Sequence, residues 1–234
     1  MKKLGILAIA CLLAITTLQA QQKTVEKTLN VPANKKVDLQ LKFGNDIKIT
    51  AWDKKNVYLK VIYEINSGKL NDALLLTFES DKESARATAD LDHELLKTGK
   101  VEDCPDQQKN ANRNYNNGRD YYSCTTINYE IMVPRDAILN VETINGNILL
   151  RGLTHLVNVK TINGFVDMDW PGKKGADVAL KTINGEVYSD LDINFSNKKD
   201  NPVVGYQLRG SLNNGGTALN LETINGNIYF RKVK

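Results

Sequence analysis

The sequence predicts an all-β protein: a parallel β-solenoid or β-roll-like domain with a more irregular, strand-rich amino-terminal half. The motif Thr-Ile-Asn-Gly occurs four times in the carboxyl-terminal half, and repetition on this scale is typical of stacked repeat folds. Apolar and polar residues alternate on both sides of each copy, as they do in strands with one buried face. Asn-Gly readily adopts positive φ and turns the chain between two such strands.

The four copies align over eight residues without a gap. They occupy 141–148, 159–166, 180–187 and 221–228. The predicted corners of the stack are the four Asn-Gly pairs, namely Asn145 and Gly146, Asn163 and Gly164, Asn184 and Gly185, and Asn225 and Gly226. An antiparallel meander is the alternative, because Asn-Gly also favours hairpins. Parallel stacking is preferred because it places identical residues in ladders.

The copies are unevenly spaced. Successive corner glycines are 18, 21 and 41 residues apart, so the last step predicts one degenerate turn between the third and fourth copies, around Val203 to Leu212. Stacking in chain order would build one charged column from Glu142, Lys160, Lys181 and Glu222, and another from Arg151, Asp169, Asp190 and Arg231. Each column would then contain a like-charged pair, which weakens both as devices that hold register. The four asparagines are the better candidates for a hydrogen-bonded ladder.

The amino-terminal half predicts strands with a less regular spacing. The segment 39–49 has an apolar layout on both sides of a glycine-containing turn, as the later copies do. Further strands are predicted at 57–63, 74–79, 85–91 and 128–133, the last of which ends at Pro134. Residues from about 93 to 123 are polar and form an insertion, within which 110–118 has the composition of a loop.

Residues 1–20 predict a secretory signal peptide. Two lysines precede an apolar run that is too short to span a membrane, and Ala20 offers a cleavage point. Cleavage would leave a single domain, 21–234, which we expect in the periplasm or on the surface of a Gram-negative bacterium. An uncleaved anchor and a lipid on Cys11 are alternatives. In an oxidising compartment Cys104 and Cys124 should form a disulfide.

Composition argues against several classes of partner. The net charge is +4, and basic residues do not cluster with aromatic ones, so we expect no nucleic-acid partner. We also expect no transmembrane segment after cleavage, no cofactor and no metal. His93 and His155, the two histidines, are expected to be isolated surface residues.

An enzymatic alternative depends on paired carboxylates. Asp167 with Asp169, and Asp190 with Asp192, lie two residues apart in predicted strands. That spacing places both side chains on one face, within the separation used by glycosidases. A carbohydrate-active β-helix enzyme, either a polysaccharide lyase or a glycosidase, is therefore the alternative to a non-catalytic protein. Solvated aspartates near strand ends would look the same.

Aromatic residues predict a binding role. Tyr188 and Tyr229 share one column of the predicted stack, with Trp170 nearby in sequence, and outward aromatic rings can stack on sugars. The alternative is that these rings cover neighbouring side chains. The insertion contains three further tyrosines, whose mixture with Asn and Arg is typical of adaptable contact loops, namely Tyr115, Tyr121 and Tyr122.

The motif copies, the segment Ile-Thr-Ala-Trp-Asp at 49–53 with Val57, and Val133-Pro134 together resemble a family. It is the bacterial family of putative adhesins of unknown function that are built from β-strand repeats and are common in the Bacteroides group. The resemblance implies an elongated, right-handed solenoid without catalytic residues. We therefore expect a non-catalytic structural or adhesive module of the cell envelope, or a secreted one, whose partner is an envelope protein or a glycan.

Overall fold

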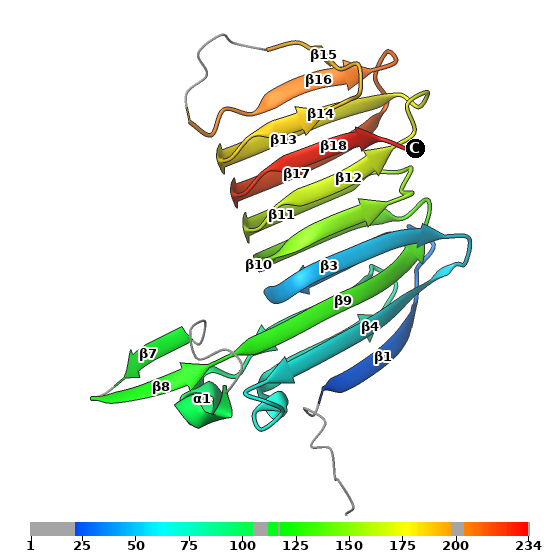
Figure 1. Cartoon of the computed structure of the whole chain (residues 1–234). Coiled ribbons are helices and arrows are strands. Elements are labelled where there is room, and N and C mark those ends of the chain that lie inside the picture. Colours follow the sequence, from blue (N-terminus) through cyan, green and yellow to red (C-terminus); the bar gives the residue numbers. More distant parts are fainter. Residues whose placement is uncertain (1–21, 105–111, 117, 198–203, 234) are drawn as a thin grey trace, which may run out of the picture.

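The structure, a computed structural model, describes residues 22–104, 112–116, 118–197 and 204–233. They form an all-β fold in which a 16-stranded sheet is accompanied by a separate two-stranded hairpin (Figure 1). The all-β prediction is confirmed, and the large sheet is mixed, with parallel and antiparallel pairs. The predicted signal peptide and Cys11 lie outside the described residues.

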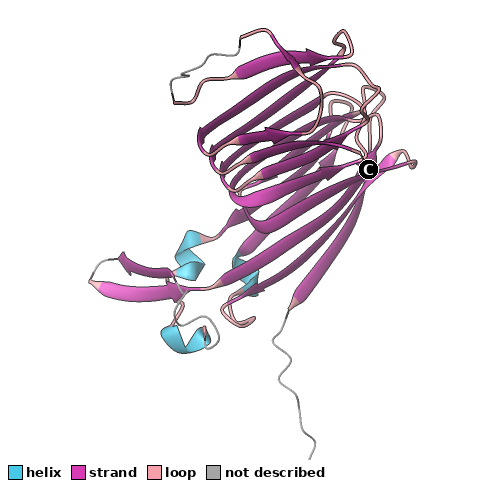
Figure 2. Cartoon of the chain, turned by 45° about the horizontal axis from the view of Figure 1, so that its top comes forward, coloured by secondary structure: helices cyan, strands magenta, loops and turns pink. Residues whose placement is uncertain are grey.

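The secondary structure follows the predicted alternation closely. The amino-terminal half contains β1 (Lys23–Asn30), β2 (Lys36–Leu41), β3 (Phe43–Trp52), β4 (Asn56–Ile65), η1 (Asn71–Ala73), β5 (Leu74–Ser80), β6 (Ala85–Leu91), α1 (His93–Leu96), η2 (Val101–Asp103), β7 (Asn112–Asn116), β8 (Arg119–Ser123) and β9 (Thr125–Pro134). The carboxyl-terminal half contains β10 (Ile138–Arg151), β11 (Val157–Asn163), β12 (Val166–Trp170), β13 (Ala176–Asn184), β14 (Val187–Ser189), β15 (Asn194–Phe195), β16 (Leu208–Leu212), β17 (Thr217–Asn225) and β18 (Ile228–Lys232). The short helices lie at the end of the molecule that carries the hairpin of β7 and β8 (Figure 2).

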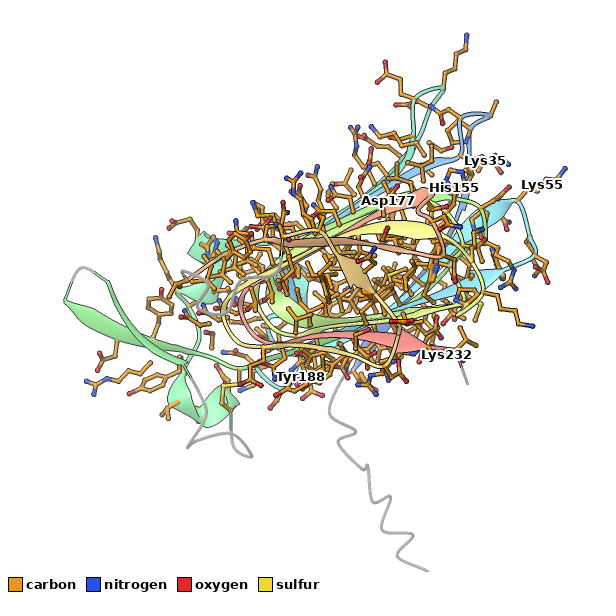
Figure 3. The ribbon with its side chains drawn as sticks, turned by 90° about the horizontal axis from the view of Figure 1, so that it is seen from above. Lys35, Lys55, His155, Asp177, Tyr188 and Lys232 are labelled. Carbon is orange, nitrogen blue, oxygen red and sulfur yellow. A yellow bond between two sulfur atoms is a disulfide. The ribbon has the colours of Figure 1, made fainter. Side chains whose placement is uncertain are left out.

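Each motif copy supplies one strand to each of two layers. The first half of β10 pairs in parallel with β2 and β11, and its second half pairs in parallel with β3 and β12. One layer therefore runs β5, β6, β2, β10, β11, β17, β13, β16, β15, and the other runs β1, β4, β9, β3, β10, β12, β18, β14. Seen from above, side chains fill the space between the layers, and Tyr188 and Asp177 lie on opposite sides (Figure 3).

The order of the copies in space differs from their order in the chain. β11 of the second copy pairs in parallel with β17 of the fourth, and β17 pairs on its other side with β13 of the third. In the second layer, β18 likewise lies between β12 and β14. The prediction of successive turns in chain order is therefore wrong, because the last copy inserts between the second and the third.

The 41-residue step also has a different cause from the predicted one. No described strand forms a degenerate turn between the third and fourth copies. β16, which overlaps the predicted segment, instead pairs antiparallel with the outer edge of β13, and β15 pairs with β16. After the third copy, the chain forms β15 and β16, and β16 covers the first-layer edge of that copy. The chain then returns to form the fourth copy between the second and third copies.

Each residue of the motif has a separate structural role. The threonines of the interior turns point inward and are buried, and their hydroxyls donate to the corner carbonyl of the turn before, as Thr223 does to Gly164 at 2.8 Å. The isoleucines point outward and are half-buried or exposed. The glycines permit close approach, because a Cβ on Gly226 would lie 2.2 Å from the carbonyl oxygen of Gly164.

The asparagine ladder is confirmed, in the spatial order of the turns. Asn163 Nδ2 donates to Asn145 Oδ1 at 2.7 Å, Asn225 Nδ2 donates to Asn163 Oδ1 at 2.8 Å, and Asn184 Nδ2 donates to Asn225 Oδ1 at 2.7 Å. Side-chain amides can form such chains because each carries both a donor and an acceptor. The ladder therefore ties all four corners together.

The insertion is more ordered than the sequence predicts. The segment 110–118, predicted as loop, contains β7, which pairs antiparallel with β8. The predicted disulfide is confirmed between Cys104 and Cys124, with Cα atoms 6.0 Å apart. It joins the end of η2 to the residue before β9, so it fixes the base of this hairpin to the sheet. None of the helices among the described residues has the length and apolarity needed to cross a membrane.

Candidate binding face at the end of the stack

The candidate site lies on the last turn, formed by β13 and β14. β16 pairs with residues 176–180 of β13, and Gly205, shortly before β16, lies against the Ile183 side chain at the corner. Among the described residues, β14 pairs with β18 alone. The first-layer half of this end and part of the corner are therefore covered, whereas the second layer presents the edge of β14.

Tyr188 is the outermost ring of an aromatic stack on this face. Its ring lies nearly parallel to that of Tyr229, at 10° and with centroids 5.3 Å apart. Tyr229 also contacts Phe165, edge to face, and the guanidinium of Arg231, whose Cζ lies 4.9 Å from its centroid. Tyr188 is 46% exposed. The predicted pairing of the two tyrosines is thus present, with Tyr188 the ring that is open to a ligand.

Glu186 holds the Tyr188 ring in place. The Tyr188 hydroxyl donates to a Glu186 carboxylate oxygen, and this hydrogen bond, with the negative charge, raises the pKa of Tyr188 above its usual value. Residues two apart in a strand share one face. The contact between Glu186 and Tyr188 could therefore have been predicted from their spacing in the sequence. The site therefore combines a neutral aromatic ring with an adjacent carboxylate.

Asp167, one of the candidate catalytic carboxylates, lies between two arginines. Arg151 and Arg231 each place a guanidinium nitrogen 3.0 Å from Asp167 Oδ2, and the Asp167 side chain is only 9% exposed. Its other oxygen is buried without a hydrogen-bond partner among the described residues. This carboxylate is covered by its neighbours rather than open to a substrate.

The remaining candidate carboxylates serve mainly as hydrogen-bond acceptors at strand ends. Asp169 Oδ1 accepts from the Gly152 amide at 2.7 Å, and Asp190 Oδ1 accepts from the Lys232 amide at 2.6 Å. Asp192 is exposed beyond the end of β14. In each proposed pair at least one member is thus engaged by the scaffold, so the geometry gives little support to the enzymatic alternative.

Trp170, a predicted ligand contact, is in the core. Its side chain is fully buried, and its indole Nε1 donates to the Lys174 carbonyl at 3.0 Å. The prediction is wrong because Trp170 lies four residues after Val166 in β12, and this even spacing places both side chains on the inner face. The structure therefore removes Trp170 from the candidate site.

The other predicted residues lie far from this face. His93 and His155 are both exposed, and the His93 ring contacts Phe43 edge to face at 6.2 Å. Tyr121 helps to line a cavity of about 570 Å³ beside the insertion, together with His93. Tyr122 is half-buried, and the side chain of Tyr115 is outside the described part.

A second cavity lies at the opposite edge of the strands. It has a volume of about 620 Å³ and is lined by Trp52, Lys54 and Arg135 among others. The Lys54 ammonium lies over the Trp52 ring and Arg135 pairs with Asp53, so these two cations have partners within the protein. In the described ranges, no three or more His, Cys, Asp or Glu side chains form a group that could hold a metal ion.

Two solved structures resemble this chain. One, a "putative cell adhesion protein" from Clostridium sporogenes, covers 90% of this chain and 100% of its own at 16% identity, with a TM-score of 0.51. The other, a "putative adhesin" from Bacteroides fragilis, covers 90% and 97% at 9% identity, with a TM-score of 0.32. The first shows a shared fold, and the second is too distant to add to that. No protein-family model matches the sequence, and no curated protein matches it significantly.

Proposed function

We propose that this chain is a non-catalytic adhesive module of the cell envelope, and that it binds glycans through Tyr188. The observation that carries the proposal is the open ring of Tyr188 at the end of an aromatic stack, beside the Glu186 carboxylate. Aromatic faces stack on the apolar faces of sugars, and an adjacent carboxylate accepts hydrogen bonds from sugar hydroxyls. The fold shared with a putative cell adhesion protein agrees with this role.

The scaffold that we propose is a right-handed β-solenoid within a single domain, 21–234. Parallel crossover connections within one sheet are right-handed in nearly all proteins. Consecutive first-layer strands such as β10 and β11 are parallel neighbours, and this supports the right hand that we propose. One continuous hydrophobic core extends from Leu29 to Phe230, which supports a single domain. The family of β-repeat adhesins is the proposed relationship.

The disulfide supports the location that we propose, the periplasm or the cell surface. The confirmed disulfide between Cys104 and Cys124 is of the kind that persists in oxidising compartments. A signal peptide at 1–20 would deliver the chain there. An envelope glycan is then the ligand class most accessible to Tyr188.

A glycan array tests the binding proposal. The full exported chain should bind a subset of glycans, and Tyr188→Ala should reduce that binding by about tenfold or more, because a stacked aromatic ring contributes roughly 1 to 2 kcal/mol. Tyr188→Phe keeps the ring and loses only the bond to Glu186, so it should retain most of the binding. Unchanged binding by Tyr188→Ala would contradict the proposal, as would cleavage of a bound polysaccharide.

A further inference from the structure

The cavity of about 570 Å³ beside the insertion differs in charge from two others. Among the described residues that line it, none is an aspartate, glutamate, lysine or arginine. Lys54 and Arg135 help to line the cavity of about 620 Å³. Asp177 and Arg209 help to line another, of about 530 Å³, on the outer face of β13 and β16. Because a charged ligand needs a partner of opposite charge when it leaves water, the cavity beside the insertion suits an uncharged ligand.

One wall of this cavity is a single face of the chain from β8 into β9. Every second residue from 121 to 127 lines it, namely Tyr121, Ser123, Thr125 and Ile127. Residues two apart in extended backbone share one face. The wall therefore presents an aromatic ring, three hydroxyl groups and an aliphatic side chain to one space.

Polar groups without partners lie along this cavity. Ser123 is only 8% exposed, and its hydroxyl has no hydrogen-bond partner within the described ranges, although buried polar groups are usually hydrogen-bonded. Asn145, the first asparagine of the ladder, also lines the cavity. Its Oδ1 accepts from Asn163, and its Nδ2 has no partner in the described part of the chain. A ligand that carries hydroxyl groups can supply both missing partners, because a hydroxyl both donates and accepts.

The wall of hydroxyl groups is held firmly in place. The disulfide between Cys104 and Cys124 begins at the residue after Ser123. The fully buried Asn66 donates from Nδ2 to the Tyr122 carbonyl at 2.9 Å, and its Oδ1 accepts from the Cys124 amide at 3.0 Å. A site that is rigid before binding loses less conformational freedom when a ligand enters.

Aromatic rings from three elements line the same cavity. Phe43 of β3 and His93 of α1 contact each other edge to face, with centroids 6.2 Å apart, and Tyr121 comes from β8. Aromatic rings that accompany a few convergent polar groups, in a cavity of about 300 to 1,000 Å³, are typical of small-molecule sites. Aromatic faces can pack on the apolar face of a sugar ring, and the hydroxyl groups of a sugar match the unpartnered groups of the cavity.

We propose that this cavity binds a neutral saccharide, which packs against Tyr121 and forms hydrogen bonds with Ser123 and Asn145. The site is separate from the one at Tyr188, because Asn145 and Asn184 are opposite ends of the asparagine ladder. Three strand spacings of about 4.8 Å place these ends about 14 Å apart. The insertion, which binding at Tyr188 does not use, thus gains a function of its own. The inference does not depend on glycan binding at Tyr188.

Saccharide binding by the chain with Tyr188→Ala tests the proposal, because this background removes the ring at the last turn. The probes are neutral oligosaccharides that end in glucose, galactose, mannose or N-acetylglucosamine, and the controls are oligosaccharides of the same length that end in a uronic acid. Isothermal titration calorimetry should detect at least one neutral probe with a Kd below about 1 mM. Its acidic counterpart should bind about fivefold or more weakly, because the cavity offers a carboxylate no cation.

Two neighbouring tyrosines provide the variant and its control. In the same background, Tyr121→Ala should weaken binding of the neutral probe about fivefold or more. Tyr122→Ala, on the opposite face of β8, should leave it unchanged. Should Tyr121→Ala fail to fold, as judged by circular dichroism, His93→Ala replaces it with the same expected loss.

Three results would overturn the proposal: no binding of any neutral probe, binding of acidic probes as tight as that of neutral ones, or equal effects of the two tyrosine substitutions. The two sites can fail separately. Loss of all saccharide binding with Tyr188→Ala alone would overturn the inference about the cavity and leave binding at the last turn intact. Saccharides that the Tyr188→Ala chain still binds, and that the added Tyr121→Ala removes, would assign the cavity as a site.

Discussion

The interior turns and the last turn share the sequence Thr-Ile-Asn-Gly but differ in environment. In the interior, the turn of β17 and β18 has neighbours on both sides in both layers, and its Thr223 and Ile228 are fully buried. At the end, β14 pairs with β18 alone among the described residues, and Thr182 and Val187 are half-buried. The same motif is buried inside the stack and partly exposed at its end, so position in the stack, more than motif identity, decides which copy is exposed.

One core column shows this difference most clearly. Leu150, Met168 and Phe230 occupy it in three turns and are fully buried, whereas Ser189 occupies it in the last turn and is exposed. The sequence itself thus replaces an apolar residue with a polar one where the column meets solvent. A polar residue there keeps the exposed end soluble and leaves the backbone edge accessible.

The largest expected difference comes from this column. Phe230→Ala should lower the free energy of unfolding by about 3 to 5 kcal/mol, because it leaves a cavity between two packed layers. Ser189→Ala, in the same column, should change it by about 0.5 kcal/mol or less. Urea denaturation of both variants measures the difference, and comparable losses would show that the last turn is covered as the interior ones are.

A smaller difference is expected from one substitution made in two turns. Val166→Ala should lower the free energy of unfolding by about 2 kcal/mol, because Val166 is fully buried. Val187→Ala removes the same atoms from a half-buried position and should lower it by about 1 kcal/mol or less. The comparison fails if the two variants have the same denaturation midpoint.

The smallest difference is expected in the asparagine ladder. Asn163 makes two ladder bonds, one as donor to Asn145 and one as acceptor from Asn225, whereas Asn184 makes one. Asn163→Ala should therefore cost about 1 to 2 kcal/mol and Asn184→Ala about half as much. In thermal unfolding, the parent chain should have the highest midpoint, Asn184→Ala a lower one, and Asn163→Ala the lowest.

Much of the scaffold follows from the sequence because its determinants are local. Period-two alternation locates the strands, Asn-Gly locates the corners, and the two remaining cysteines of an exported chain identify the disulfide. The asparagine ladder follows from the same reasoning, since identical residues stack wherever the turns do. The hairpin of β7 and β8 does not follow, because within the described ranges its strands pair only with each other and they carry few of the apolar residues that mark a strand.

The spatial order of the turns is the feature that sequence spacing fails to predict. Spacing along the chain favours neighbours in sequence, whereas the structure places β17 between β11 and β13. The charges contain the missing signal: chain order sets Lys160 beside Lys181, and the observed order sets Glu222 between them. If like charges avoid facing each other in a parallel ladder, the charges favour the observed order of the turns over chain order. At the site, Trp170 lies in the core rather than on the surface, because its even spacing from Val166 in β12 places it on the inner face.

The fourth motif copy, β17 and β18, lies between the second and third copies, and disulfide trapping tests this arrangement directly. Neighbouring strands lie about 4.8 Å apart and next-nearest strands about twice as far, and a disulfide spans Cα separations of only about 4.4 to 6.8 Å. The double variant Asn163→Cys with Asn225→Cys should form a disulfide, detected by peptide mapping of the oxidised protein. Asn163→Cys with Asn184→Cys should stay reduced, because β17 separates these corners. A disulfide between positions 163 and 184, with none between 163 and 225, would contradict the inserted order.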